Sequence, residues 1–319
     1  MPHIPTLFRP KGLFKNMHFA TIYSAKLRPM PKLLQERERL ELPDGDFIDI
    51  DWSYATNPAK KVALLLHGLE GNAQRVYMKG HAKPIVEAGW DVVAMNHRGC
   101  SGEENRKYES YNSGRTEDLK QLLSHVLAKD RYEEIVLIGF SLGGNLVLKY
   151  MGEESDIPKL VTKGIAVSTP LNLRGSLEAL ERRENWVYTT SFLLDLRAKY
   201  KRKMDRFPNQ MNAAQLKKVK SLLDFDNLYT APAHGFEDAF QYYEKSSSLP
   251  FLPNISKPVF ILNAQNDSFL SPKCYPYQLS EQRKNIYLET PKYGGHVGFH
   301  ETNKMYYSER RVLQFLTEF

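Results

Sequence analysis

The sequence is poor in cysteine and contains no long hydrophobic run, and each shortage argues against a class of protein. Cys100 and Cys274 are the only cysteines among 319 residues, too few for a disulfide framework or a four-cysteine metal site. Such a chain suits a reducing compartment, so we expect the cytoplasm. The apolar runs are strand-sized, well short of the ~20 residues that a membrane-spanning helix needs. The basic N-terminus also lacks the apolar segment and cleavage site of a signal peptide, so we expect neither leader nor anchor.

Internal repeats and low-complexity segments are also missing, which leaves an ordinary globular composition. Hydrophobic residues make up 42% of the chain and charged residues 25%, as in typical folded domains. The net charge of +7 raises nucleic acid and anionic membranes as partners. The basic residues are spread out, however, and their one local concentration, at 197–206, is interpreted as a solvated helix face. We therefore expect no nucleic-acid binding, while the basic N-terminus leaves weak peripheral contact with an anionic membrane open.

Short apolar strands alternate with helical patterns along most of the chain. We expect a β-hairpin around the turn at 43–45, because apolar and acidic residues alternate over 48–52. A helix is predicted over 116–129, with Thr116 as its N-cap. Further strands are predicted at 62–66, 91–96, 135–139, 164–168, 259–264 and 285–289. This alternation predicts an α/β fold, in which a mostly parallel central sheet carries helices on both faces within a single domain over residues 1–319.

The alternation stops in one region, residues 171–249. That stretch has no convincing strand but several aromatic, basic and helical segments, and prolines bound it on both sides. It lies between two predicted core strands. We therefore predict a helical cap or lid inserted within the domain at 171–249, rather than an independent domain.

One serine lies at a strand-to-helix junction with glycines on either side. Residues 139–143, Gly-Phe-Ser-Leu-Gly, follow a predicted strand and precede a helical pattern. In this context the G-x-S-x-G spacing is typical of a nucleophile elbow. A sharp turn there strains the serine backbone and brings neighbouring elements so close that the flanking positions must lack side chains. We therefore predict that Ser141 is an exposed nucleophile at the N-terminus of a helix.

A serine hydroxyl needs a base, and the base needs an acid that orients it. Asp267 follows a late core strand, and His296 follows the last strand behind two glycines, which gives the chain order serine, acid, histidine. Asp226 and Asp238 are weaker rivals for the acid because neither follows a strand. His300 is the rival base, but it lies further from the glycine turn, in an expected helix start. We predict Asp267 and His296 as the catalytic partners of the serine.

A tetrahedral intermediate also needs hydrogen-bond donors for its negative oxygen. The backbone N–H of Leu142, directly after the serine, is one candidate. The loop at 67–71, His-Gly-Leu-Glu-Gly, follows an early core strand, and its glycines allow the N–H of Leu69 to be the second. The same loop also suits a plain glycine-rich turn or a phosphate cradle, but the lysine and spacing of a Walker A sequence are missing.

Eight segments spread over nearly the whole chain carry a resemblance to a known family. They are FKNMHFATIY (14–23), HGLEGN (67–72), NHRGCSGEENR (96–106), YNSGRTEDL (111–119), GFSLGGN (139–145), APAHGFEDAFQYYEKSSS (231–248), NAQNDSFL (263–270) and YGGHVGF (293–299). The chain resembles the YheT-type branch of the α/β-hydrolases, which is related to plant embryogenesis-associated hydrolases and animal α/β-hydrolase-domain lipases. The resemblance implies an α/β-hydrolase fold, action on carboxylic esters, and Ser141, Asp267 and His296 as the charge-relay triad. Arg98 is interpreted as a tie between loops rather than as a catalytic residue.

These observations predict ester hydrolysis through an acyl-enzyme intermediate, with no metal or organic cofactor. The expected substrates are esters or lipids with short or medium acyl chains, or acylglycerols, and Trp186, Tyr188 and Phe192 are candidates to line an acyl pocket. An acyltransferase or a thioesterase would use the same residues. A non-catalytic binding protein of the same fold ranks last, because no member of the predicted triad is missing. The acyl length, the head group and the oligomeric state stay open.

Overall fold

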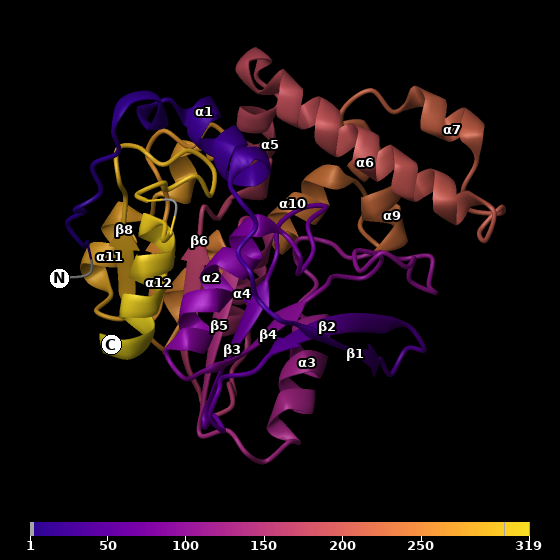
Figure 1. Cartoon of the computed structure of the whole chain (residues 1–319). Helices are drawn as coiled ribbons and strands as arrows, with labels where there is room; N and C mark the ends of the chain where they lie inside the picture. The colour runs from indigo at the N-terminus through magenta and orange to yellow at the C-terminus, as the bar shows by residue number, and fades with distance from the viewer. Residues whose placement is uncertain (1–2, 303, 319) are drawn as a thin grey trace.

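The chain folds around one eight-stranded sheet with the strand order β1-β2-β4-β3-β5-β6-β7-β8. The computed structural model describes residues 3–302 and 304–318. In chain order the strands are β1 (Glu36–Glu41), β2 (Phe47–Ser53), β3 (Lys61–Leu66), β4 (Asp91–Met95), β5 (Glu134–Phe140), β6 (Val161–Val167), β7 (Val259–Leu262) and β8 (Ile286–Glu289). β1 and β2 form the predicted hairpin, and β2 also pairs antiparallel with β4. The remaining pairings in this sheet are parallel, which confirms the predicted fold class (Figure 1).

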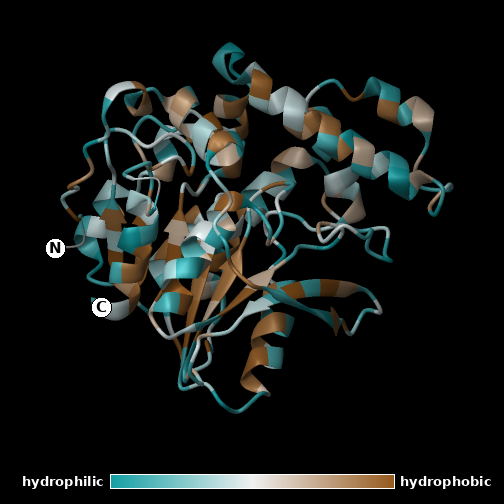
Figure 2. Cartoon of the chain, viewed as in Figure 1, coloured by the Kyte–Doolittle hydropathy of each residue, from teal (hydrophilic) through white to brown (hydrophobic). Residues whose placement is uncertain are grey.

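Helices cover both faces of the sheet because its parallel strands, mostly brown in Figure 2, are apolar on both sides. The covering helices are α2 (Val76–Glu87), α3 (Glu117–Leu127), α4 (Leu142–Glu153), α11 (Tyr277–Gln282) and α12 (Tyr307–Glu318). In β3, Val62 and Leu64 belong to the core shared with α3, α4 and α11. Ala63 and Leu65 alternate with these residues along the strand and belong to the core on the other face of the sheet, with α2 and α12. Successive side chains of a strand face opposite sides, so one strand contributes to two cores.

The helix predicted over 116–129 is α3, and its expected apolar face, including Leu119 and Leu122, is buried. The predicted capping by Thr116 is wrong. Its side chain makes no hydrogen bond to the first turn of α3 and instead donates one to Glu153 at the end of α4. The hydroxyl therefore joins two helices and does not close the end of one.

The segment between β6 and β7, all of which the structure describes, contains helices and no strand. Its elements are α5 (Leu173–Leu180), η3 (Arg183–Asn185), α6 (Trp186–Met204), α7 (Ala213–Lys218), α8 (Leu222–Phe225), η4 (Asp226–Thr230), α9 (Ala231–Ala233), α10 (Ala239–Ser246) and η5 (Leu249–Asn254). Figure 1 places α6 and α7 on the side of the sheet toward which the arrow of β6 points. Tyr200, Phe225 and Tyr229 pack there in a small core of their own. Among the described residues, neither α6 nor any other helix has the length and apolar content needed to cross a bilayer.

Arg98 ties several loops together, as the sequence predicted. Its guanidinium donates two hydrogen bonds to Asp118 in α3, at 2.8 and 2.7 Å. It also donates to Asp44 at 2.7 Å and Asp46 at 3.2 Å, both at the turn of the β1–β2 hairpin. Arg98 is only 3% exposed, and Asp46 and Asp118 are buried with it, whereas Asp44 is partly exposed. The pairs with Asp46 and Asp118 are therefore desolvated and depend on each partner staying in place.

We expect Arg98→Met to lower the free energy of unfolding by about 3–5 kcal/mol, because buried carboxylates would lose their cation. Arg106→Met, in the same loop, removes an exposed pair with Glu41 and should cost little. Urea unfolding monitored by fluorescence measures both. Equal losses in the two variants would contradict the role assigned to Arg98.

Candidate active site

Ser141 occupies the turn between β5 and α4 with φ 52° and ψ −121°, a strained region for a residue with a side chain. The flanking glycines are required by close packing. A Cβ on Gly139 would lie 2.2 Å from the carbonyl oxygen of Gly143, and one on Gly143 would lie 2.3 Å from that of Leu66. β3, β5 and α4 therefore approach one another at the level of the backbone. The strained turn predicted for this serine is present.

The hydroxyl of Ser141 is not used by the helix that follows it. Ser141 is the N-cap residue of α4, but its side chain makes no capping hydrogen bond. Its position is set by the backbone, since its N–H donates to the carbonyl oxygen of Val167 at 2.9 Å. The N–H of Leu142 belongs to the first turn of α4, where helical acceptors are absent. The hydroxyl thus lies beside the partly positive end of a helix.

Asp267 and His296, predicted as acid and base, are in contact. His296 Nδ1 lies 2.8 Å from Asp267 Oδ2, and Asp267 Oδ1 accepts the backbone N–H of Phe269 at 3.0 Å. The side chain of Asp267 is fully buried, and that of His296 is 11% exposed. The ring of Phe269 stacks on the imidazole with the centroids 4.2 Å apart. Because Nδ1 faces the carboxylate, Nε2 is the nitrogen left for another partner.

Two of the rival residues lie elsewhere. Asp238 caps α10 and accepts the backbone N–H of Gln241 at 2.8 Å. His300 stacks on Phe14 with a centroid distance of 3.7 Å. It lies in the loop before α12 and not at a helix start, so that expectation was wrong. Neither residue lines the cavity that contains the elbow serine.

The loop at 67–71 lies directly against the serine. A Cβ on Gly68 would lie 3.0 Å from the Cβ of Ser141, so a glycine permits this approach. His67 holds the loop, because its Nδ1 donates to the carbonyl oxygen of Gly68 at 2.7 Å and its Nε2 accepts the N–H of His97 at 3.1 Å. Burial lowers the pKa of both histidines, that of His97 to about 4. Both are therefore neutral near pH 7 and act as fixed hydrogen-bonding groups.

The backbone N–H groups of this loop differ in their partners. The N–H of Gly68 donates to the hydroxyl of Tyr77 at 3.0 Å. The N–H of Glu70 donates to the hydroxyl of Tyr111 at 2.9 Å. Across residues 3–302 and 304–318, the N–H of Leu69 between them finds no hydrogen-bond acceptor. Leu69 also lines the cavity that contains the serine, so a residue with an unused backbone donor borders this cavity.

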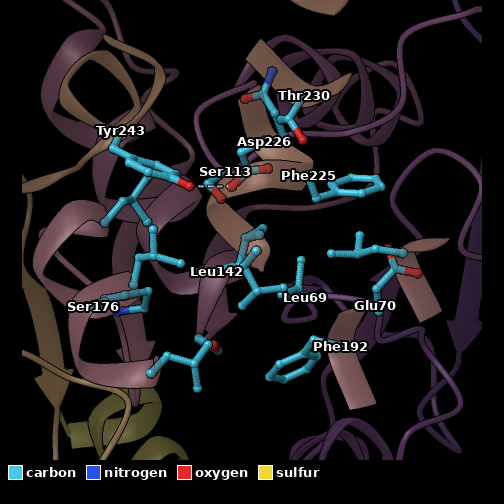
Figure 3. Close-up of a pocket in the computed structure, with 18 of the residues that line it drawn as sticks. Leu69, Glu70, Ser113, Leu142, Ser176, Phe192, Phe225, Asp226, Thr230 and Tyr243 are labelled. Carbon is cyan, nitrogen blue, oxygen red and sulfur yellow. Dashed lines mark hydrogen bonds between the residues drawn. The ribbon is translucent and has the colours of Figure 1, made fainter. Parts of the chain in front are cut away.

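Ser141 and His296 both line one cavity of about 160 Å³, whose surroundings Figure 3 shows. Most other side chains around it are apolar. Many of these come from the inserted helices, including Leu173, Leu177, Leu180, Phe192, Leu196, Leu222, Phe225 and Tyr229. Of the three aromatic residues predicted to line an acyl pocket, Phe192 does so. Trp186 and Tyr188 do not, and Trp186 is 66% exposed. Helical periodicity indicated the helix but not which of its faces meets the cavity.

A carboxylate that the sequence argument set aside also lines this cavity. Asp226 accepts a hydrogen bond from the hydroxyl of Tyr243 at 2.6 Å (Figure 3). Burial raises the pKa of Asp226 to about 6. His296 is bonded to Asp267, however, so Asp226 is not the acid that orients the histidine. Its place in the cavity arises from the fold of the inserted segment, which no strand signal marks.

The N-terminal segment supports the loop of His296, a role that the motifs alone did not reveal. In α1 (Met17–Ile22), the hydroxyl of Thr21 accepts the backbone N–H of His296 at 2.9 Å. After β6, the hydroxyl of Ser168 accepts the N–H of Val297 at 2.9 Å. Two hydroxyls from distant parts of the chain therefore fix consecutive peptides of this loop. The sequence signal for α1 was its place among the segments of the family resemblance.

An α/β-hydrolase has a mostly parallel sheet, a serine on a strained strand-to-helix turn, and an aspartate-bonded histidine that lines the same cavity as the serine, and all three are present here. The chain belongs to the α/β-hydrolase family, whose model, described as alpha/beta hydrolase fold, matches residues 62–302. The family predicted from the sequence segments is thereby confirmed, and the protein is an esterase- or lipase-type hydrolase.

Relatives and solved structures agree with this assignment. The YheT protein of Escherichia coli (strain K12), named as a candidate esterase, is 37% identical over 299 residues, which cover 92% of this chain and 86% of that protein. Phospholipase ABHD3 of Mus musculus is 30% identical over 305 residues, which cover 91% of this chain and 74% of that protein. The solved structure of the Pyrococcus furiosus esterase Pf2001 matches with a TM-score of 0.57 at 18% identity, over 92% of this chain and 98% of that one. At that identity the match supports the fold alone.

The raised pKa of Asp226 predicts a pH-dependent stability. A carboxyl whose pKa is higher in the folded state favours folding below its unfolded pKa, near 4, and this contribution is lost as the pH rises through about 6. Asp226→Asn removes the titration. Relative to this variant, the parent should lose about 2–3 kcal/mol of stability between pH 4 and pH 8, at roughly 1.4 kcal/mol per pKa unit.

Urea unfolding of both proteins at the two pH values measures this difference. Asp238→Asn, at the exposed cap of α10, is the matched control. A parent-to-variant difference for Asp226→Asn that stays constant with pH would contradict the effect of burial on this carboxyl.

Proposed function

We propose that the protein hydrolyses carboxylic esters with short or medium acyl chains, acylglycerols included, through a triad of Ser141, His296 and Asp267. The observation that carries the proposal is that the strained serine and the aspartate-bonded histidine line the same cavity. The names of the relatives, a candidate esterase and a phospholipase, support ester hydrolysis.

The geometry supports the following sequence of steps. Asp267 accepts the Nδ1–H of His296 and so keeps the Nε2 lone pair available as a base. Nε2 takes the hydroxyl proton of Ser141 while Oγ attacks the acyl carbonyl carbon. The imidazolium then gives this proton to the leaving alcohol. Water, deprotonated by the same nitrogen, attacks the acyl-enzyme and releases the carboxylic acid and the free serine.

The N–H groups of Leu69 and Leu142 are the proposed oxyanion donors. The first has no acceptor within the described chain, and the second lies in the first turn of α4. Gly68 brings the loop of Leu69 into contact with Ser141. Donors that are already fixed need no rearrangement as charge develops, and losing one typically costs about 3 kcal/mol in the transition state.

The inserted segment 171–249 is the proposed cap, and it supplies the wall that the acyl chain contacts. Leu177, Phe192 and Leu196 line the cavity from this segment, opposite the serine and histidine loops of the core. The cavity volume of about 160 Å³ is below the ~300–1,000 Å³ of pockets for drug-sized ligands. This size favours a short or medium acyl chain over a long one.

The cytoplasm is the proposed compartment. Cys100 and Cys274 are both free and buried, and unpaired cysteines are stable in a reducing environment.

We expect Ser141→Ala to lower the kcat for p-nitrophenyl butyrate by at least about 10⁴-fold, because the nucleophile is lost while the binding cavity stays intact. A fluorophosphonate probe should label the parent at Ser141 and leave the variant unlabelled. Asp238→Asn serves as a control that keeps activity and labelling. A folded parent that neither reacts with the probe nor cleaves esters would refute the proposal, and products formed with added alcohols or from thioesters would reveal acyl transfer or thioesterase activity.

Leu196→Trp should shift the acyl preference, because a larger side chain at this position fills the cavity. The ratio of kcat/KM for p-nitrophenyl octanoate to that for the acetate should fall by about 10-fold or more, since each methylene in an apolar pocket contributes about 1–3 kcal/mol. Leu194→Trp is the matched control on the same helix, since Leu194 is 62% exposed. The same shift in both variants would show that the cavity does not hold the acyl chain.

A further inference from the structure

The position of Leu69 depends on its neighbour Glu70. Glu70 has a φ of 49°, in the left-handed region that a residue with a side chain adopts only when its surroundings hold it there. Its N–H donates to the hydroxyl of Tyr111 at 2.9 Å, and the same hydroxyl donates to its carboxylate at 2.7 Å. Both the backbone and the side chain of Glu70 are therefore fixed, and with them the peptide that follows Leu69.

A lysine from the inserted helix α6 completes the environment of Glu70. Lys199 Nζ lies 2.7 Å from Glu70 Oε1 and donates to Cys100 Sγ at 3.3 Å. It also lies over the ring of Tyr111, 4.8 Å from the centroid. The side chains of Lys199 and Glu70 are 5% and 9% exposed. A buried ion pair of this kind has one favourable geometry, because neither charge can turn to solvent instead.

The charge states around this pair are consistent with an ion pair among neutral neighbours. Burial raises the pKa of the Cys100 thiol to about 12, and burial raises that of Tyr111 well above its usual value. Burial acts against the charged form of Lys199, yet the pKa of Lys199 is raised overall, in part by the neighbouring carboxylate of Glu70. The lysine is therefore charged near pH 7, and the thiol and the phenol are protonated.

The same pair forms a wall between two cavities. Glu70 and Lys199 line the apolar cavity that contains Ser141. They also line a polar cavity of about 270 Å³, together with Arg75 and Arg202. Loss of the ion pair would therefore loosen the loop and would join the apolar cavity to a polar one.

Lys203, one turn later in α6, shows that not every buried lysine of this helix serves the same loop. Its Nζ donates to the carbonyl oxygens of Lys107 and Tyr108 at 2.9 and 3.0 Å and to the hydroxyl of Ser110 at 3.0 Å. These contacts anchor α6 to residues 107–110 and do not include the loop at 67–71. Lys203 is thus a matched control for Lys199.

We propose that Lys199 is a positioning residue for ester hydrolysis, whose ion pair with Glu70 holds the N–H of Leu69 where the oxyanion forms. The inference rests on the proposed function, since it assigns Leu69 as an oxyanion donor. Lys199 itself does not touch the reacting atoms in this scheme.

The test compares Lys199→Met with Lys203→Met in the full-length protein on p-nitrophenyl acetate, a small ester that leaves most of the apolar cavity empty. Lys199→Met should lower kcat by about 10- to 100-fold, less than the loss of a whole oxyanion donor, with KM nearly unchanged. Its affinity for an alkyl boronic acid, which forms a tetrahedral adduct with the serine, should fall in parallel. Lys203→Met should keep a kcat within about threefold of the parent.

Glu70→Gln and the double variant Glu70→Gln/Lys199→Met separate positioning from stability. The double variant should be more thermally stable than Lys199→Met, because no unpaired buried charge remains. Its kcat should stay as low as that of Lys199→Met. Unchanged kcat in a destabilised Lys199→Met would overturn the inference, and so would equal kcat losses in the two lysine variants. Fluorophosphonate labelling of the parent distinguishes failure of the proposed function from failure of the role of Lys199. An unlabelled parent would refute the proposed function. A labelled parent whose Lys199→Met variant keeps the parental kcat would refute only the role of Lys199.

Discussion

The contact of three backbones at the β5–α4 turn is the constraint on which the rest of the structure depends. Gly139 and Gly143 leave no room for a side chain, so β3, β5 and α4 meet at van der Waals distance. The strain at Ser141, which costs on the order of 1–3 kcal/mol, persists because the buried strands on either side hold the turn from both ends. The parallel strands of the sheet bring their carboxyl ends to one edge. For this reason Gly68 after β3 lies against Ser141, and the loops after β7 and β8 line the cavity that contains the same serine.

Beyond the sheet, buried polar contacts rather than apolar packing set the positions of the loops. Arg98 joins the β1–β2 hairpin to α3, Arg28 joins the N-terminal segment to Glu309 of α12, and Lys199 joins α6 to the loop after β3. Such pairs add little net stability compared with apolar side chains of the same size, but their geometry is specific. An apolar contact tolerates sliding, whereas a guanidinium bonded to two carboxylates does not. Loops that present single backbone donors to a reaction need this kind of restraint.

Whether the sequence predicted a feature depends on how far apart along the chain its interacting residues lie. The hairpin, the parallel strands and the turn at Ser141 were predicted because each depends on residues within one or two elements, through alternation, periodicity and glycine spacing. The contact between Asp267 and His296 was expected because both follow adjacent strands of a parallel sheet. The roles of Thr21 and Lys199 were not predicted, since their partners lie 275 and 129 residues away. Thr116 was predicted wrongly because a local cap competed with a carboxylate from another helix.

Under the proposed function, the arrangement of α6 would link the binding of an acyl chain to the chemistry at the serine. Phe192, Leu196, Lys199 and Lys203 follow one another at intervals of four, three and four residues, so they lie along one face of the helix. The first two line the apolar cavity, and the last two hold the loops beneath it. An acyl chain bound as proposed would pack against this face and would favour the position of α6 in which Lys199 reaches Glu70. Binding energy from a remote, unreactive part of the substrate can raise the rate only if it helps to build contacts used in the transition state. A single helix face that borders both the proposed acyl site and the proposed oxyanion loop would provide a direct physical route for that transfer.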